Sequence, residues 1–533
     1  MGQWTSPPTR RELSLLLFCV TIFIIAYNAD ASLRLVGLDA SVLPFSSYKP
    51  APIGPDGRRL APYRDKLEAE IFGEWDWEEG RVAGAKTAEA ARLMGKKGKG
   101  DVYVHGEGVT GREAMWLQGV GEGKYGLEEG MGTTNVNDDF VRWGEDVPRT
   151  TLVQHIPGFT ILDNVLFAFG TFFLVTDDPS SMPDVSSVAS SIVNHTEPPR
   201  DIDWQVLPHS NALNKLGPYG GRIHGVTFMS YDTPAATDSH TLLSLQRLYS
   251  TIDPTSAPHR LLFSSIPTFS DRKPEPDDDT IVRQRSSLGI HPYLLKSAYP
   301  SLAGPLFSED FDDFVGMGAP MVLDRLVVAD RGAARRHGAA TLPPWAPPFS
   351  DLHAPTAWFE PVRHNLAGYF GVQEEGARRH GYEVTYLAQQ AGLGGAKLRD
   401  ADHQALLDAL KRLRGEGVTV HIINESTGWT ERMRAILRST MVLGVYGEHL
   451  SDSVFMKPSP HAMLIELFPS GAFTRDWEIV VRSMGIRYVG FQGEQKFTSE
   501  ALPAVSNPSS LQDIHIDAKA IVAAINDELA RRV

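Results

Sequence analysis

The chain has a single cysteine, Cys19, which lies in the N-terminal apolar run Leu13–Tyr27. The rest of the 533-residue sequence therefore has no thiol for a disulfide or for a Cys-based metal site. Basic residues are outnumbered, with 51 Lys and Arg against 65 Asp and Glu, which gives a formal net charge of −14. Proteins that bind nucleic acid need a basic stripe, and this sequence lacks one. We expect stability to come from core packing and expect no nucleic-acid partner.

Motifs of several enzyme classes are also absent. The chain has no Gly-x-Ser-x-Gly elbow, no His-Glu-x-x-His pair and no Walker loop, which argues against the hydrolases that use them. No Asp-x-Asp pair stands in the usual Mn²⁺ context, and Asp277–Asp279 lies in a charged, proline-flanked stretch typical of solvated surface. We expect no metal site and no cofactor. An unrelated α/β hydrolase or dehydrogenase stays as a third hypothesis for the function.

One long apolar run is present, and Arg10 and Arg11 precede it. Its length just spans a thin bilayer of the early secretory pathway, and the arginines favour a cytosolic N-terminus. We expect a cytosolic tail (1–12), a transmembrane signal-anchor (13–28) and a lumenal body, the single-pass type II topology of many Golgi or endoplasmic reticulum proteins. The lipid bilayer is then a partner. The small-x-small pattern Ala29-Asp-Ala31 keeps a cleaved signal peptide open as the alternative.

Two segments match the N-glycosylation pattern, Asn194-His-Thr196 and Asn424-Glu-Ser426. The first lies in a polar, serine-rich stretch and is expected to be accessible. The second follows an apolar strand and is expected to be inaccessible.

Composition and periodicity divide the chain into segments. Residues 29–150, rich in Pro and Gly at their start, are interpreted as a stem and N-terminal extension. An α/β domain is expected at 151–341, where strands are predicted at 159–164, 167–176, 225–231, 260–263 and 323–328, and a helix at 240–249. The Pro-rich segment 342–355 is interpreted as a linker, and 356–533 as a second domain.

The second domain carries the clearest pattern. Helices are predicted at 356–370, 402–413, 430–438, 450–456, 474–484 and 517–530, and strands at 382–388, 419–423, 441–445, 462–467 and 487–491. Strand, turn, helix and strand at this spacing form half of a doubly wound sheet. Ligands of such sheets bind outside the carboxyl ends of the strands, where the turn Tyr446–Gly447 lies.

Several short motifs occur in a fixed order between residues 155 and 493. They are His155-Ile-Pro-Gly-Phe-Thr160, Tyr231-Asp-Thr-Pro234, Asp330-Arg331, Val384-Thr-Tyr386 followed by Asp402-His403, Leu443-Gly-Val445, Glu466-Leu-Phe-Pro469 and Gly471-Ala-Phe-Thr-Arg-Asp-Trp477. In this order they resemble glycosyltransferase family 61, especially its fungal members. The resemblance implies a GT-B architecture of two Rossmann-like domains facing a cleft. It also implies inverting, metal-independent transfer of xylose, N-acetylglucosamine or a similar sugar from a nucleotide sugar, held by the C-terminal domain, to a glycan or glycoprotein.

Inverting transfer needs a base for the acceptor hydroxyl and dipoles or cations around the leaving diphosphate. We take four residues as catalytic candidates, namely Asp232, His240, Glu448 and His449. A helix N-terminus binds a diphosphate without a metal ion, and an acidic residue at a strand end binds ribose hydroxyls. The expected donor-binding residues are Gly444, Gly447, Leu450, Ser451, Glu466, Gln389 and Gln390.

The chain also departs from the family at this turn. It has Tyr446-Gly-Glu-His-Leu-Ser451 where the family commonly has His-Gly-Asn-Gly-Leu-Thr, and Gln389 or Gln390 where the family has an arginine. Loss of the second glycine limits backbone approach to a phosphate, and loss of the arginine removes a fixed positive charge. The first hypothesis is therefore an active glycosyltransferase, and its alternative is a catalytically inactive relative that binds a glycan or serves as a scaffold subunit.

Overall fold

The computed structural model describes residues 140–531 apart from 255–256, 273–281, 301, 303, 317–318, 340, 373–380, 391–395, 415–417 and 507–512. The expected cytosolic tail, signal-anchor and acidic triplet, and all but the end of the expected stem, lie outside the described residues. Within the described ranges, no helix combines the length and hydrophobicity that a membrane span requires. All described residues belong to one of the two contact-defined units of the chain.

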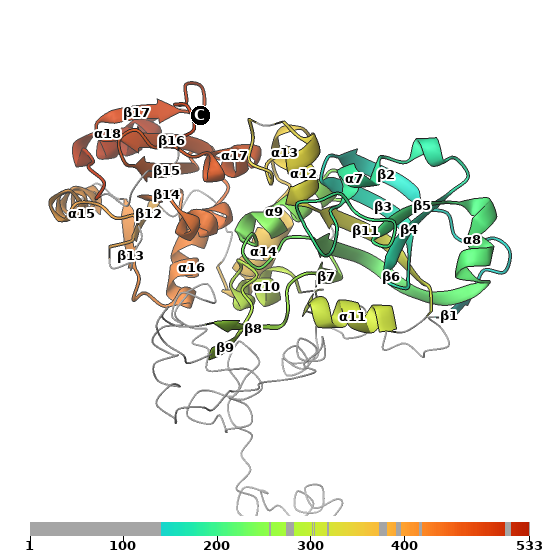
Figure 1. Cartoon of the computed structure of the whole chain (residues 1–533). Helices are drawn as coiled ribbons and strands as arrows, with labels where there is room; N and C mark the ends of the chain where they lie inside the picture. Colours follow the sequence, from blue (N-terminus) through green and yellow to red (C-terminus); the bar gives the residue numbers. More distant parts are fainter. Residues whose placement is uncertain are drawn as a thin grey trace, which may run out of the picture. The chain divides into compact units, whose positions relative to one another are not determined.

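The first part of the described chain forms a mixed nine-stranded sheet, coloured cyan to yellow in Figure 1. Its strand order is β10-β7-β6-β11-β3-β4-β5, with β1 paired to β6 and β2 to β3. Strands β7, β6 and β11 are mutually parallel, and β3 runs antiparallel to β11. The bounds are β1 Phe140–Arg142, β2 Thr151–Ile156, β3 Phe159–Ala168, β4 Thr171–Thr176, β5 Trp204–Pro208, β6 Tyr219–Ser230, β7 Arg260–Phe263, β10 Pro305–Leu306 and β11 Met321–Ala329.

The second part forms a six-stranded sheet of order β13-β12-β14-β15-β16-β17, in which only the last pair of strands is antiparallel. The chain builds outward from β12 to β13 and then in the other direction from β14, so a topological switch point lies between β12 and β14. The predicted doubly wound half-sheet is confirmed. The bounds are β12 Glu383–Ala388, β13 Thr419–Asn424, β14 Met441–Val445, β15 Met463–Phe468, β16 Arg487–Gln492 and β17 Gln495–Thr498.

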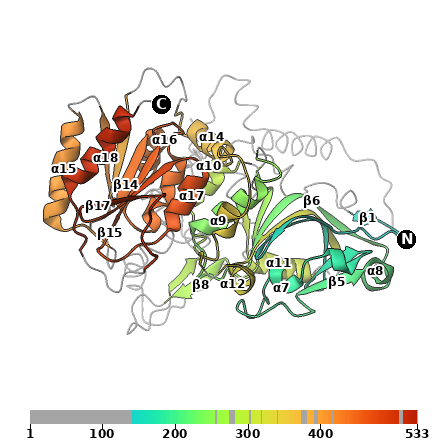
Figure 2. The same ribbon diagram turned by 90° about the horizontal axis from the view of Figure 1, so that it is seen from above.

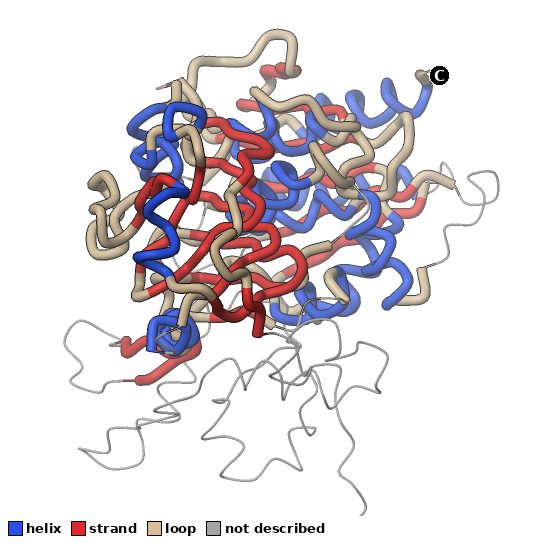
Figure 3. The backbone as a smooth tube through the Cα atoms, turned by 90° about the vertical axis from the view of Figure 1, so that its right-hand side faces the viewer, coloured by secondary structure: helices blue, strands red, loops and turns tan. Residues whose placement is uncertain are grey.

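Helices lie between strands in both parts of the chain, although β1 to β4 follow one another without a helix (Figure 3). In the first part the helices are α7 Val185–Val188, α8 His209–Leu216, α9 Ser239–Tyr249, α10 Pro292–Ala298, α11 Ser308–Gly316 and α12 Arg331–His337, with the 3-10 helix η4 Pro179–Ser181. The same part contains a small two-stranded sheet of β8 Phe269–Arg272 and β9 Val282–Arg285. The remaining helices are α13 Pro347–Ser350, α14 Glu360–Tyr369, α15 Asp400–Arg414, α16 Trp429–Arg438, α17 Asp476–Ser483, α18 Ala518–Ala530 and the 3-10 helix η5 Glu448–Phe455.

Apolar residues of the six-stranded sheet face helices on both sides, as near-continuous hydrophobic parallel strands require. Helices α15 and α18 lie side by side on one face and share a core with Val384 and Ile465 (Figure 2). Helices α16 and α17 and η5 cover the other face, where Val442 and Leu464 belong to a larger core. The fold is therefore mixed α/β, with a mostly parallel second sheet compatible with a Rossmann-like fold.

The Pro-rich segment 342–355 packs against α9. Trp345, Ala346 and Phe349 are buried in the larger core, and the Trp345 carbonyl accepts a hydrogen bond from Ser244 Oγ at 2.9 Å. Arg247 donates to the Pro348 and Leu352 carbonyls. Prolines end regular periodicity without preventing burial, which is why composition alone did not indicate this packing.

The two glycosylation patterns have the same local structure. Asn194 Oδ1 accepts hydrogen bonds from the N–H and hydroxyl of Thr196, and Asn424 Oδ1 accepts them from Ser426. Both asparagines are exposed, so the expectation that the second is inaccessible is wrong. Asn424 is the last residue of a strand at the edge of its sheet, where apolar neighbours in the sequence do not enforce burial.

Candidate functional site

The start of α9 contacts the turn that follows β14. Asp238 caps this helix through Oδ1, which accepts from the His240 N–H at 2.9 Å. The next residue, Ser239, donates its N–H and its hydroxyl to Glu448 Oε1 at 3.1 and 2.5 Å. Glu448 is exposed as a residue, but desolvation of its carboxylate raises its pKa above the ordinary value. A carboxylate from the six-stranded part is thus held against a helix of the nine-stranded part.

A buried charge network lies behind Ser239. Asp232 follows the end of β6 and is 5% exposed. Its Oδ2 accepts from Thr241 Oγ1 at 2.7 Å and lies 3.1 Å from Arg331 Nε. Burial raises the pKa of Asp232 to about 6, against the opposing effect of the nearby Arg331. This carboxyl therefore titrates close to neutral pH.

Arg331, the first residue of α12, joins the two acids of this network. Its guanidinium donates to Asp238 Oδ1 and Oδ2 at 2.5 and 2.9 Å in a bidentate arrangement, and to Thr241 Oγ1. Burial alone would raise the pKa of Asp238, but the His240 and Arg331 side chains outweigh it and hold the pKa well below its usual range. Asp238 therefore stays ionised as the partner of Arg331.

The His240 ring is stacked between two tryptophans. Its centroid lies 4.0 Å from that of Trp345 and 4.5 Å from that of Trp477, each at an interplanar angle of 21°. Its Nε2 lies 3.1 Å from the Asp476 carbonyl oxygen, and its Nδ1 lies 3.4 Å from Asp238 Oδ1. With 3% of its surface exposed, His240 is a packing residue in this conformation.

The turn after β14 is closely packed. Gly447 adopts φ = 138°, which favours glycine, and its carbonyl accepts from Trp477 Nε1 at 2.9 Å. Leu450 is buried beneath the turn against Gly444, where a Cβ on Gly444 would lie 2.9 Å from Leu450 Cδ2. No side chain caps the start of η5, which begins after Gly447. Ser451 lies partly exposed within η5.

His449 turns its ring toward Gly447, and its carbonyl accepts a hydrogen bond from Arg432 Nη2 at 2.7 Å. Burial, with the charge of Arg432, lowers the pKa of His449 to about 3. An imidazole with this pKa is neutral at physiological pH and accepts a proton weakly. The opposite pKa shifts of the two side chains therefore favour Glu448 over His449 as a base.

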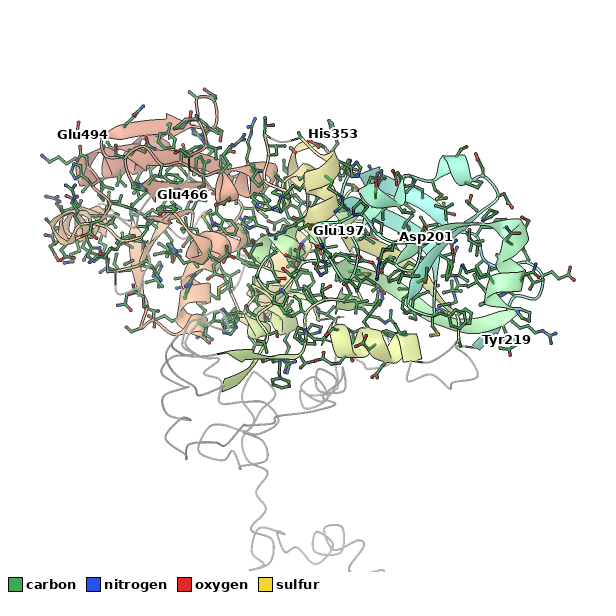
Figure 4. The ribbon with its side chains drawn as sticks, in the orientation of Figure 1. Glu197, Asp201, Tyr219, His353, Glu466 and Glu494 are labelled. Atoms are coloured by element: carbon green, nitrogen blue, oxygen red, sulfur yellow. The ribbon has the colours of Figure 1, made fainter. Side chains whose placement is uncertain are left out.

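Glu466 lies inside the six-stranded sheet rather than at its open edge (Figure 4). It is 0% exposed, and its Oε2 accepts from the Tyr488 hydroxyl at 2.9 Å. Burial raises the pKa of Glu466 to about 8, aided by the negative charges of Asp476 and Glu478. This carboxyl is thus mainly protonated at neutral pH, which suits a buried sheet position better than contact with a ribose.

Gln389 and Gln390 follow β12, on the other side of the switch point from Gly447. Leu387 pairs with Gly444 in the adjoining strands, so both carboxyl ends meet at the same edge. The Gln390 N–H donates to Glu425 Oε1. The amide Oε1 and Nε2 of Gln390 are buried.

Four of the expected residues therefore lie around α9 and the turn: Asp232, His240, Gly447 and Glu448. Leu450 and His449 support that turn from below and beside it, whereas among the described residues no hydrogen bond or ion pair joins Ser451, Glu466, Gln389 or Gln390 to the network. Sequence reasoning did not identify Ser239, Trp345 or Trp477 as parts of this site. The sequence Asp-Ser-His before an apolar helix is an N-cap signal that locates Asp238, but a partner about 200 residues away leaves no local pattern.

Among the described residues, no group of three or more His, Cys, Asp or Glu side chains is arranged to hold a metal ion. Two arginines bring positive charge near the turn. Arg331 lies in the network, and Arg432 pairs with Asp452 at 2.6 Å. Searches of protein-family models and of curated proteins found no match to this chain.

Proposed function

We propose that this chain is a glycosyltransferase of GT-B form. It transfers a sugar such as xylose or N-acetylglucosamine from a nucleotide sugar to a glycan or glycoprotein, with inversion and without a metal ion. Support comes from the resemblance of the ordered motifs to glycosyltransferase family 61. The doubly wound six-stranded sheet, with its switch point between β12 and β14, suits the nucleotide-binding half of such an enzyme.

The observation that carries the proposal is the position of Glu448. It is an exposed residue at the carboxyl edge of the second sheet, and its carboxylate has a raised pKa and lies against α9 of the first sheet's part. In the proposed reaction it takes the proton of the acceptor hydroxyl as that oxygen attacks the anomeric carbon. The bond from the anomeric carbon to the nucleoside diphosphate breaks, and the uncapped start of η5 stabilises the leaving group.

Asp232 and Arg331 have a supporting role in this proposal. Their network fixes the first turn of α9, and through Ser239 it fixes the carboxylate of Glu448. The lumenal, type II arrangement in the Golgi or endoplasmic reticulum belongs to the same proposal, with residues 13–28 as the bilayer anchor.

The close packing of side chains around the turn favours a second candidate function. Trp477 bonds to the Gly447 carbonyl, the His449 ring lies against Gly447, and Tyr446 stacks on Phe468 with centroids 5.6 Å apart. Bulky groups thus surround the place where a diphosphate would approach the backbone. This packing suits a catalytically inactive relative that binds a glycan or acts as a scaffold.

Nucleotide binding separates the two candidates. We expect the melting temperature of the full-length chain to rise with at least one uridine or guanosine nucleotide or nucleotide sugar, because a ligand of the native state stabilises it by mass action. Glu448→Gln should keep this response and lose at least a hundredfold in transfer rate, whereas Glu494→Gln, an exposed control (Figure 4), should retain both. A flat response to every nucleotide would overturn the transferase and favour the inactive relative.

A further inference from the structure

A groove of about 660 Å³ runs between the edge strand β13 and helix α16. β13 is separated from β14 by β12, so the groove is a different place from the turn that holds Glu448. Its volume lies in the range of small-molecule sites, about 300–1,000 Å³. Its lining comprises Arg414, Val420, His421, Ile422, Ile423, Gly428, Thr430, Glu431, Arg434, Ala435 and Arg438.

The lining is basic, although the whole chain carries a formal net charge of −14. Arg414, Arg434 and Arg438 contribute three guanidinium groups and His421 an imidazole, against the single carboxylate of Glu431. A concave surface of one charge sign concentrates ligands of the opposite sign. The groove is thus an electropositive site on an acidic protein.

Some of these basic side chains already have partners within the chain. Glu383 pairs with His421 at 2.7 Å and with Arg438 at 3.4 Å, and Arg414 donates to the Val420 carbonyl. Arg434 differs, because its guanidinium lies 5.8 Å from the Phe370 ring centroid and has no carboxylate partner in the part of the chain that the structure describes. An exposed arginine stacked on a ring is held in place while its N–H donors remain available.

We infer that this groove binds a small polyanion through Arg434, with Arg414 and Arg438 beside it. Arg434 and Arg438 are four residues apart on α16, so their Cβ atoms are about 5–6 Å apart on one helix face. A ligand with two or more anionic groups, phosphate or carboxylate, matches that spacing. The Arg434 guanidinium offers two parallel N–H groups to such an oxyanion.

Calorimetric titration of the full-length chain tests this inference, with inorganic tripolyphosphate and citrate as the probes. We expect saturable binding of at least one probe, and the stronger of the two identifies phosphate or carboxylate as the preferred group. Arg434→Gln should weaken binding at least tenfold, and Arg434→Lys less so, because lysine keeps the charge but loses the fork. Arg335→Gln, an exposed arginine on α12, is the matched control and should change affinity less than twofold.

A variant that is expected to strengthen binding distinguishes a lost contact from misfolding. Glu431→Gln removes the one carboxylate of the lining and should tighten binding severalfold, a gain that unfolding does not produce. Absence of saturable binding of both probes, or equal weakening by Arg434→Gln and Arg335→Gln, would overturn the inference. Neither result bears on nucleotide binding at the turn, so failure here is distinguishable from failure of the proposed transferase.

Discussion

Glu448 accepts both the N–H and the hydroxyl of Ser239 on a single carboxylate oxygen, across 209 residues of sequence. This pair ties the turn of the second sheet to the first turn of α9, which follows the β6 strand of the first sheet. The position of the candidate base therefore depends on a helix start in another part of the fold.

Removal of the hydroxyl in Ser239→Ala tests this tie. The backbone N–H remains as a donor, so we expect a loss of about 1 kcal/mol in the free energy of unfolding, measured by urea titration. Ser451→Ala, in η5 three residues after Glu448 and without a side-chain hydrogen bond in the described structure, should change it by less than about 0.5 kcal/mol. Equal effects of the two substitutions would show that the Ser239 hydroxyl contributes nothing specific.

Arg331→Gln should be far more disruptive. It leaves Asp232 and Asp238 without their shared cation, and removing one partner of a buried ion pair costs about 3–5 kcal/mol. Chemical unfolding at pH 7.5 measures the loss, and Arg335→Gln on the same helix is the exposed control.

If unpaired negative charge causes the loss of stability in Arg331→Gln, neutralising one of the two acids should restore part of it. Adding Asp232→Asn to Arg331→Gln should recover part of the lost stability, because it neutralises one of the two acids left without a cation. A double variant that is less stable than Arg331→Gln alone would contradict that explanation.

Glycosylation tests the lumenal proposal. Asn194 and Asn424 are both exposed and share the same bonded turn, so expression of the full-length chain in a eukaryotic secretory host should add two glycans. Asn194→Gln and Asn424→Gln should each remove one endoglycosidase-sensitive step in electrophoretic mobility. Asn211→Gln, exposed and outside any acceptor pattern, should remove none. Unchanged mobility of the wild-type chain after endoglycosidase treatment would argue against a lumenal body.

Local sequence patterns predicted most elements of the second sheet. Buried parallel strands such as β14 and β15 are continuous apolar runs, so their positions follow from the sequence alone to within a residue or two. Short strands of the first sheet, such as β1 and β10, carry too few residues to show a period. Strand order and pairing depend on contacts between distant segments, which periodicity does not contain.

In the candidate site, too, the positions of residues were predictable and their contacts were not. Asp232 and Glu448 each stand at a strand end or turn, where chemistry is expected in an α/β sheet. What they contact was not predictable, because Ser239 lies on α9 and Arg331 on α12, far from Glu448 and Asp232 in the sequence. For Glu466 the position at a strand end suggested ribose binding, but a neighbouring strand supplies Tyr488 and encloses the carboxyl.

The buried carboxyl of Glu466 gives the clearest pH dependence. Its pKa of about 8 in the folded protein lies above the ordinary value of about 4.3, so the folded state holds a proton that the unfolded chain releases. The stability it contributes is fully present below pH 4 and is lost as pH rises through 8, with a total of about 5 kcal/mol. Asp232 acts in the same direction but between about pH 4 and 6, so it contributes little to the change across pH 6.5–9.

Glu466→Gln keeps the shape of the side chain and removes its titration. We expect wild-type stability to fall across pH 6.5–9 by about 2 kcal/mol or more while the variant changes much less, so that the variant becomes relatively more stable as pH rises. Urea midpoints at several pH values measure both curves. Glu494→Gln, exposed between β16 and β17, should follow the wild-type curve. Parallel curves for Glu466→Gln and the wild type would mean that Glu466 is ionised in the folded protein at neutral pH, and that the Tyr488 hydroxyl and its surroundings stabilise the charge.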